Sequence, residues 1–395
     1  MKFAHLADCH IGGWTEEKLK ELTIKSFQKA VSICLEENVD FVLIAGDLFN
    51  TAIPQIDLIK QATEELKKLL DNNIPVYLVP GSHDFSPSGK TILSVLEKAG
   101  LITNVSNQEE NNLKFTLDKK TNAKITGMLG LRSSLELFKY QTINKEELEK
   151  EQGFKIFILH SGIKEFMPIG LPFIALPFDL VPKNFNYYAA GHVHYVFTKE
   201  IAKNSIVAYP GPLFPNNFQE LEELEHGGFY IIDKNLNIQR KEIKLKDVIK
   251  IKLDANNKSP HEIENELKGI KSVKDKIVLI RIGGALKEGN PSDINFNLNN
   301  LKEAYIILKN TSKLFSKEYE DIKIEANVEN IEQKIVEENL DSIKEINFTQ
   351  EGIISLLNIM NKEKEDGETV SDFEDRLVKD IKNELKLGVL FKNED

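Results

Sequence analysis

Short apolar runs recur along the first 246 residues, and most of them end in glycine or in a polar residue. Their richness in Val, Ile, Phe and Tyr is typical of buried β-strands. Four such runs are FVLIAGD, VYLVPGSHD, KIFILH and NYYAAGHVH. Between the first strands, residues 16–37 carry apolar side chains at helical spacing, namely Leu19, Leu22, Phe27, Val31 and Cys34. Strands that alternate with such helices predict an α/β sheet.

Later strand-like segments follow one another without long helices between them. They are KITGML, FKIFILH, NYYAAGH, SIVAYPG, GGFYIID and IQRKEIKL. This change predicts a second sheet packed against the first. We therefore expect an α/β fold over residues 1–246, a two-sheet sandwich flanked by helices.

The pattern changes after residue 246. Residues 247–330 combine strand-like KIKLDA, KIVLIRIGG and IKIEANV with helix-like HEIENELKGI, which predicts a small α+β domain. Residues 331–395 predict a polar linker and a helical hairpin whose second helix opens with capping-box spacing at Ser371-Asp372-Phe373-Glu374. The hairpin either packs on its own protein or offers its apolar stripe to a partner, and the polar linker favours the partner.

Composition narrows the class of protein. With 395 residues, 41% hydrophobic and 29% charged, the chain has room for two or three globular domains. It has no apolar run near the ~20 residues of a membrane span, and its start does not resemble a signal peptide. Two cysteines, Cys9 and Cys34, fit a reducing cytoplasm. A net charge of −11 means that DNA binding would need a local lysine-rich surface or a basic partner.

Residues that could bind a metal or catalyse a reaction lie where the predicted strands end. Five polar clusters there hold five of the eight histidines: Asp8-Cys9-His10, Gly46-Asp47, Gly81-Ser82-His83-Asp84, His160 and Gly191-His192-Val193-His194. Because ligands of open α/β sheets bind beyond the carboxyl ends of the strands, we expect these clusters to converge. Carboxylate and imidazole suit manganese, zinc or iron. Two Asp and four His are too many for one tetrahedral ion, and they predict a two-metal phosphoesterase with ions about 3.5–4 Å apart.

Spacing suggests roles for these residues. Asp8 and His10 are two positions apart and can face one ion, and Asp47 can bridge two ions with its two oxygens. His160 supplies a further nitrogen, while His192 and His194 could serve one ion each or both serve one. A metal-bound hydroxide would attack phosphorus. His83 then either protonates the leaving oxygen or anchors its loop, and its placement favours catalysis.

The ordered motifs D-x-H, G-D, G-x-H-D, H and G-H-x-H resemble the calcineurin-like metallophosphoesterase superfamily. Gly46-Asp47-Leu48-Phe49, His160-Ser161-Gly162 and Tyr209-Pro210-Gly211 are similar to its SbcD/Mre branch of double-strand-break repair nucleases. The resemblance covers about the first 215 residues. It implies a two-sheet metallophosphoesterase core, a small capping domain, and a C-terminal helical segment that binds an SbcC/Rad-type coiled-coil ATPase. It also implies a homodimer that acts on DNA.

The resemblance further implies two Mn²⁺ ions, with other divalent ions as alternatives. One would be held by Asp8, His10, Asp47 and His194, and the other by Asp47, Ser82, His160 and His192, with His83 as the catalytic histidine. The implied activities are exonuclease action on duplex ends and endonuclease action on single strands or hairpins. This chain departs from the family at Ser82, where asparagine is usual, and at Asn50, where many relatives have histidine.

Two other functions compete with the DNA nuclease. A small-molecule or nucleotide phosphodiesterase of the same superfamily would have little use for the region after residue 246. A weakly catalytic DNA-end tethering scaffold gains some support from Ser82 and Asn50. However, a scaffold has no chemical reason to keep all six Asp and His ligand candidates.

Overall fold

The computed structural model describes residues 1–86, 90–106, 108–109, 112–131, 134–167, 175–316, 355–356, 359–360, 362 and 370–384. Two six-stranded sheets form the core of the first part of the chain, as the strand pattern predicts. The first sheet has the order β14 (Ile238–Ile243), β13 (Gly227–Asp233), β1 (Lys2–Leu6), β2 (Phe41–Ala45), β3 (Val76–Val79), β4 (Thr103–Asn104). The second has the order β11 (Val196–Ala202), β12 (Ser205–Pro210), β10 (Tyr187–Gly191), β9 (Lys155–His160), β8 (Lys124–Met128), β7 (Thr116–Leu117).

The central strands of both sheets are parallel, since β1 pairs with β2, β2 with β3, and β9 with both β8 and β10 in that sense. Strand β2 is buried along its whole length because both of its faces are covered. Its Phe41, Leu43 and Ala45 face the core between the sheets, while Val42 and Ile44 face the helices. This alternation follows from the two-residue period of a strand.

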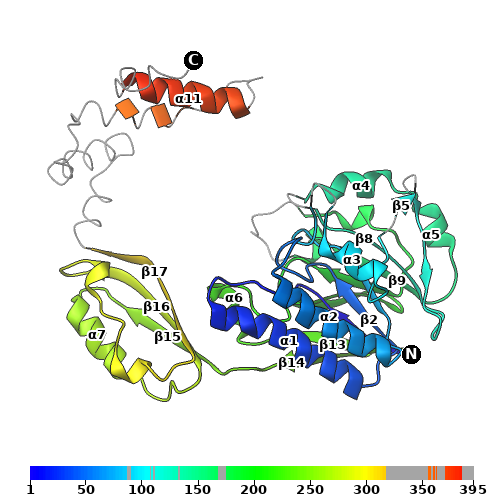
Figure 1. Cartoon of the computed structure of the whole chain (residues 1–395), viewed down its shortest axis with the longest axis horizontal. Coiled ribbons are helices and arrows are strands. Elements are labelled where there is room, and N and C mark those ends of the chain that lie inside the picture. The colour runs from blue at the N-terminus through cyan, green and yellow to red at the C-terminus, as the bar shows by residue number, and fades with distance from the viewer. Residues whose placement is uncertain are drawn as a thin grey trace. The chain divides into compact units, whose positions relative to one another are not determined.

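Helices cover the outer faces of the two sheets (Figure 1). On the first sheet pack α1 (Glu17–Glu36), α2 (Ile56–Asp71) and α3 (Ile92–Lys98). The outer face of the second sheet packs against α4 (Glu136–Thr142) and α5 (Glu146–Lys150). Two short elements complete this part of the chain, α6 (Phe218–Leu224) and the β5 (Gln108–Glu109)–β6 (Asn112–Leu113) ribbon. The predicted α/β sandwich flanked by helices is therefore confirmed.

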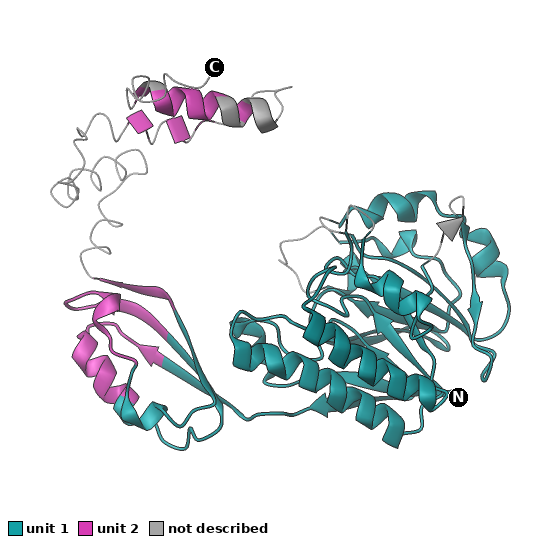
Figure 2. Cartoon of the chain, in the orientation of Figure 1, with its two compact units in different colours: residues 1–252, 268–281, 297–310 teal, residues 253–267, 282–296, 311–395 magenta. Residues whose placement is uncertain are grey.

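A small α+β module follows the sandwich and contains the predicted strands KIKLDA and KIVLIRIGG and the predicted helix, whereas the predicted strand IKIEANV lies outside the described residues. Its three-stranded sheet has the order β15 (Val248–Asp254), β16 (Ile277–Leu286), β17 (Ile306–Ser316), accompanied by α7 (Pro260–Lys268). The chain divides into two compact units (Figure 2). The first contains residues 1–252, 268–281 and 297–310, and the second contains residues 253–267, 282–296 and 311–395. The division at residues 246 and 330 stays a prediction.

The second helix of the predicted hairpin is present as α11 (Val370–Glu384). Its Phe373, Leu377 and Ile381 are half-buried. The linker at residues 331–347 and most of the first hairpin helix lie outside the described residues. None of the helices described here combines the length and apolar character needed to cross a bilayer.

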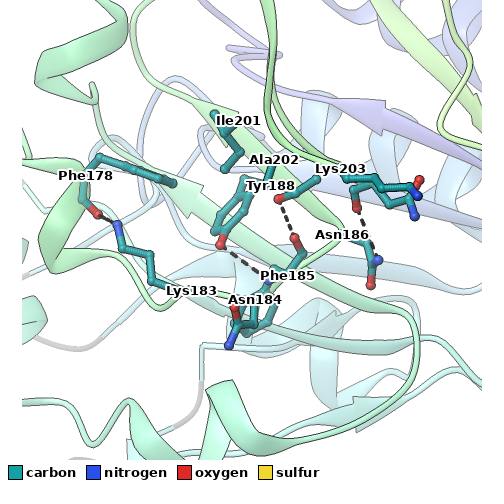
Figure 3. Close-up of a pocket in the computed structure, with 11 residues that line it drawn as sticks. Phe178, Lys183, Asn184, Phe185, Asn186, Tyr188, Ile201, Ala202 and Lys203 are labelled. Atoms are coloured by element: carbon teal, nitrogen blue, oxygen red, sulfur yellow. Dashed lines mark hydrogen bonds between the residues drawn. The ribbon is translucent and has the colours of Figure 1, made fainter.

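A pocket of about 310 Å³ lies where β10 begins and β11 and β12 join (Figure 3). Its polar side chains bond to their own chain: Nζ of Lys183 donates to the carbonyl of Phe178 at 2.6 Å, and Ser205 donates to the carbonyl of Phe185 at 2.6 Å. This pocket is at the edge where parallel strands start, opposite the edge that carries the predicted metal ligands.

Candidate metal centre

The predicted metal ligands gather where β1, β2, β9 and β10 end. Asp8 and His10 follow β1, Asp47 follows β2, and His160 is the last residue of β9. Backbone bonds hold the loops together, since the amide of Asp8 donates to the carbonyl of Gly46 at 3.2 Å and that of His10 to the carbonyl of Asp47 at 2.9 Å. The predicted convergence of these segments is present.

Many of these residues have an unusual backbone. The φ angles are 50° at Asp8, 41° at His10, 52° at Asp47, 92° at His192 and 51° at His194. Left-handed backbone costs a residue other than glycine about 1–3 kcal/mol. The turns direct the side chains back over the end of the sheet, where they meet.

Two glycines leave the space that the ligands occupy. A Cβ atom on Gly46, whose φ is +82°, would lie 2.1 Å from Nδ1 of His160. One on Gly81 would lie 2.2 Å from Oδ1 of Asp47. Any larger residue at either position would therefore displace a candidate ligand.

Both candidate carboxylates are buried, with Asp8 1% and Asp47 2% exposed. The backbone amide of His192 donates to both oxygens of Asp8 at 3.0 Å. The amide of His83 donates to Oδ1 of Asp47 at 2.8 Å, which leaves Oδ2 of Asp47 facing the centre. There Oδ2 lies 3.1 Å from Nε2 of His160 and 3.6 Å from Nε2 of His10.

Four histidines share one arrangement, in which Nδ1 contacts an oxygen of the protein. The partners are Asn50 Oδ1 for His10 at 3.1 Å, the Asn50 carbonyl for His83 at 2.9 Å, the Ala45 carbonyl for His160 at 2.8 Å and Glu220 Oε1 for His194 at 2.9 Å. Because these oxygens accept, Nδ1 donates, and the lone pair of each neutral imidazole is on Nε2. Metal-binding histidines have this same outer support.

The Nε2 atoms of His10 and His194 face each other at 3.0 Å, and Nε2 of His194 lies 3.6 Å from Oδ1 of Asp8. Nε2 of His160 is buried and makes no hydrogen bond within the described part of the chain. Several lone pairs and two carboxylates thus converge on a small buried volume. Such donors fit divalent ions of the manganese, iron or zinc type.

Three groups of candidate ligand atoms each lie within 4.8 Å of one another: Asp8, His10 and His194; His10, Asp47 and His83; and Asp8, Asp47 and His160. His192 belongs to none of these groups, although its ring packs edge-on against that of His160 at 5.0 Å. Ser82 is buried, and its chain neighbours Gly81 and His83 both lie against Asp47. The structure thus brings Asp8, His10, Asp47, His160 and His194 together, and His83 belongs to one of these groups as well.

Charges in the cluster are coupled. Burial lowers the pKa of His194, but Asp8 and Glu220 outweigh it and raise the value to about 10. Burial also lowers the pKa of His160, but the nearby Asp47 carboxylate outweighs it and raises the value to about 9. These raised pKa values favour the protonated form of both imidazoles at neutral pH. A divalent cation would compete with these protons, so metal binding should release protons.

Glu220 was not predicted from the sequence. It lies on α6, and its carboxylate accepts from Nδ1 of His194 at 2.9 Å and from the amide of Asn216 at 2.7 Å. Glu220 follows Asn217, the N-cap of α6, by three residues, which is the spacing of a capping motif. From the sequence alone, this spacing predicts only a local role at the start of the helix. No pattern in the sequence links it to His194.

Asp84 and Asn50 also support the centre. The Asp84 carboxylate accepts from the amides of Leu48, Phe49 and Gly81, each at 3.1 Å, and so ties the loops after β2 and β3 together. Burial, followed by the charge of Asp47, raises the pKa of Asp84 to about 7. Asn50 holds His10 with its side chain and His83 with its carbonyl.

Glu220→Gln should weaken metal binding about 10- to 100-fold, because the amide can still accept from Nδ1 of His194 but lacks the negative charge that makes this imidazole a stronger ligand. Isothermal titration with Mn²⁺ measures the effect. Glu223→Gln, an exposed position on the same helix, is the matched control. Equal affinity in the two variants would show that Glu220 does not support a metal ligand.

Comparison with known proteins agrees with this geometry. Residues 1–196 match the calcineurin-like phosphoesterase family. The chain is 26% identical over 385 residues to the DNA double-strand break repair protein Mre11 of Archaeoglobus fulgidus, with 94% of this chain and 83% of the relative covered. For the proteins of the same description from Methanococcus maripaludis and Methanocaldococcus jannaschii, identity is 26% over 377 residues and 29% over 292 residues. The match to the Methanococcus maripaludis protein covers 88% of this chain and 98% of that protein. The match to the Methanocaldococcus jannaschii protein covers 69% of this chain and 74% of that protein. The chain therefore belongs to the calcineurin-like metallophosphoesterase superfamily, within its SbcD/Mre branch.

Proposed function

We propose that this protein is a two-metal DNA nuclease that acts in double-strand-break repair. The observation that carries the proposal is the convergence of two buried carboxylates with imidazole nitrogens whose opposite nitrogens are already bonded to the protein. Similarity to DNA double-strand break repair proteins over most of the chain supports DNA as the substrate.

For the first ion we propose Asp8, His10, Asp47 and His194 as ligands. The 3.0 Å approach of His10 to His194 and the nearby Asp8 oxygen support this set. For the second ion we propose Asp47, Ser82, His160 and His192. Support for it comes from Oδ2 of Asp47, 3.1 Å from the unbonded Nε2 of His160. Manganese is our choice for both ions.

Two divalent ions held there would lower the pKa of a water molecule and neutralise charge on the phosphate. The protein's own contribution begins with Asp8 and Asp47, which backbone amides hold in place. His83 supplies acid–base chemistry: its Nδ1 donates to the Asn50 carbonyl, so Nε2 can carry a proton to the leaving oxygen.

The activities we propose are exonuclease action on duplex ends and endonuclease action on single strands or hairpins. The test is digestion of end-labelled duplex and single-stranded DNA with Mn²⁺, Mg²⁺ or Zn²⁺. We expect degradation that depends on manganese. Hydrolysis of a small phosphodiester without DNA degradation would favour a nucleotide phosphodiesterase. No hydrolysis of either substrate, even with the ATPase partner added, would favour a DNA-end tethering scaffold.

A coiled-coil ATPase of the SbcC/Rad type is the partner that we propose for the C-terminal helices. On α11 the apolar Phe373, Leu377 and Ile381 follow helical spacing and remain half-exposed. A partner that grips duplex DNA would also offset the net charge of −11. Buried free thiols at Cys9 and Cys34 support a cytoplasmic location.

The double variant Leu377→Asp, Ile381→Asp should abolish binding to the ATPase, because it places two charges on the apolar stripe of α11. Co-purification or a binding titration with the cognate ATPase measures this. Val378→Asp, next to the stripe and 49% exposed, is the control. Normal binding by the double variant would exclude α11 as the contact.

A homodimer through helices of the first unit is our further proposal. Leu70 on α2 and Val95 on α3 are apolar and 43% and 59% exposed, so both are available for contact with a second copy of the chain. Val95→Glu should therefore convert a dimer to a monomer in sedimentation analysis. A dimer that survives this change, or a monomeric native protein, would contradict the proposal.

A further inference from the structure

A second pocket, of about 370 Å³, lies beside the metal centre. It is formed by the loops that leave β1 and β2, at residues 11–15 and 50–58. These loops continue side by side past the ends of their strands, where Ile11 pairs with Phe49 and the amide of Asn50 donates to the carbonyl of Ile11 at 3.1 Å. The pocket is therefore built on the same two loops that carry Asp8, His10 and Asp47.

The lining is apolar at the bottom and polar at the rim. Buried Ile11, Pro54 and Leu58 form the bottom, and Trp14 provides an aromatic wall. The rim includes the side chains of Thr15, Thr51 and Gln55, all exposed. A pocket with buried apolar residues, one aromatic side chain and exposed polar residues suits a ligand that has one aromatic part and one hydrated part.

Trp14 is held in position. Its Nε1 donates to the carbonyl of Pro215 at 2.9 Å, and its φ is 69°, in the left-handed region. The ring is half-buried, so part of it remains available to the pocket. A rigid, partly exposed aromatic ring loses little entropy when a planar group stacks on it.

Asn50 connects the pocket to the candidate metal centre. It lines the pocket, and it also bonds His10 through its side chain and His83 through its carbonyl. A group in the pocket is thus separated by a single residue from the histidine proposed to act on the leaving oxygen. Lys20, which also lines the pocket, is ion-paired with Glu17 at 2.6 Å and so adds no net charge there.

We propose that this pocket receives an unpaired base of the DNA strand next to the phosphodiester that is cut, with Trp14 as the stacking surface. The inference rests on the proposed nuclease function and defines how its substrate is held. Stacking on an aromatic side chain is worth about 1–3 kcal/mol per base and is tolerant of sequence. Because a paired base cannot enter, the pocket favours single strands and frayed ends over intact duplex.

Four variants test the pocket in steady-state kinetics on a single-stranded oligonucleotide and on a small phosphodiester without a base. Trp14→Ala should raise the KM for the oligonucleotide about tenfold, while Trp14→Phe should retain most of the affinity. Ile53→Glu, at a pocket residue that is 71% exposed, should also raise this KM without disturbing the core. Ile56→Glu, 82% exposed and outside the pocket, is the matched control. Small-phosphodiester hydrolysis should be unchanged in all four.

A second readout does not depend on cleavage. Trp14 is the only tryptophan, so the intrinsic indole fluorescence reports on the pocket alone. In EDTA, a single-stranded oligonucleotide should quench it, and a strand of abasic nucleotides should not. Equal quenching by both strands, or an unchanged oligonucleotide KM in both Trp14→Ala and Ile53→Glu, would overturn the inference. If the native protein hydrolyses neither substrate, the proposed function fails, and the fluorescence comparison still decides on the pocket.

Discussion

Asp47→Asn should reduce phosphodiester hydrolysis at least about a thousandfold. The substitution keeps the shape of the side chain and an oxygen that can accept from the His83 amide. However, it removes the negative charge that faces His160 and His10 at 3.1 Å and 3.6 Å. Because Asp47 is the only carboxylate shared between the two proposed ligand sets, the loss should affect both ions.

The assay is metal-dependent hydrolysis of a small phosphodiester and of single-stranded DNA, together with calorimetric titration of Mn²⁺. Asp57→Asn, an exposed position on α2, controls for loss of a carboxylate elsewhere in the domain. A variant at Asp47 that keeps more than about a tenth of the native rate would rule out this carboxylate as a bridge.

His83→Ala should lower the rate of DNA cleavage about 10²- to 10⁴-fold and leave the Mn²⁺ affinity unchanged. The side chain is half-buried, and its Nδ1 contact with the Asn50 carbonyl keeps Nε2 available. A proton delivered by His83 matters most for a poor leaving group. The loss should therefore be larger for DNA than for a nitrophenyl phosphodiester.

The same variant distinguishes two roles for His83. One nitrogen of its ring lies close to candidate ligand atoms of His10 and Asp47, so a metal-ligand role is the competing explanation. In that case Mn²⁺ binding would weaken, and both substrates would lose activity equally. Circular dichroism of the variant shows whether the fold is intact.

The strand pattern predicts the two-sheet core well because both faces of its central strands are covered. In β2, burial at every position gives the continuous apolar run FVLIA, and the polar residue after it must lie at the edge of the sheet. The site residues Asp47 and His160 are found by this reasoning alone. Strand β17 is missed, since its sequence IILKNTSKLFS mixes polar and apolar residues without a continuous run.

What the sequence does not reveal comes from side-chain contacts between distant segments. Glu220 meets His194 across 26 residues of sequence, and Asn50 meets His10 across 40. Left-handed backbone at His10 and His194 is equally hidden, because histidine has no preference for that conformation strong enough to mark it. The ligands are thus predictable as residue types at strand ends, whereas their orientation is a property of the folded chain.

The most direct test of a two-metal centre is anomalous diffraction from crystals of the protein soaked in Mn²⁺, measured at the manganese absorption edge. We expect two peaks about 3.5–4 Å apart, one beside Asp8, His10 and His194 and the other beside His160, with Asp47 between them. A single peak, or two peaks that share no carboxylate, would contradict the account.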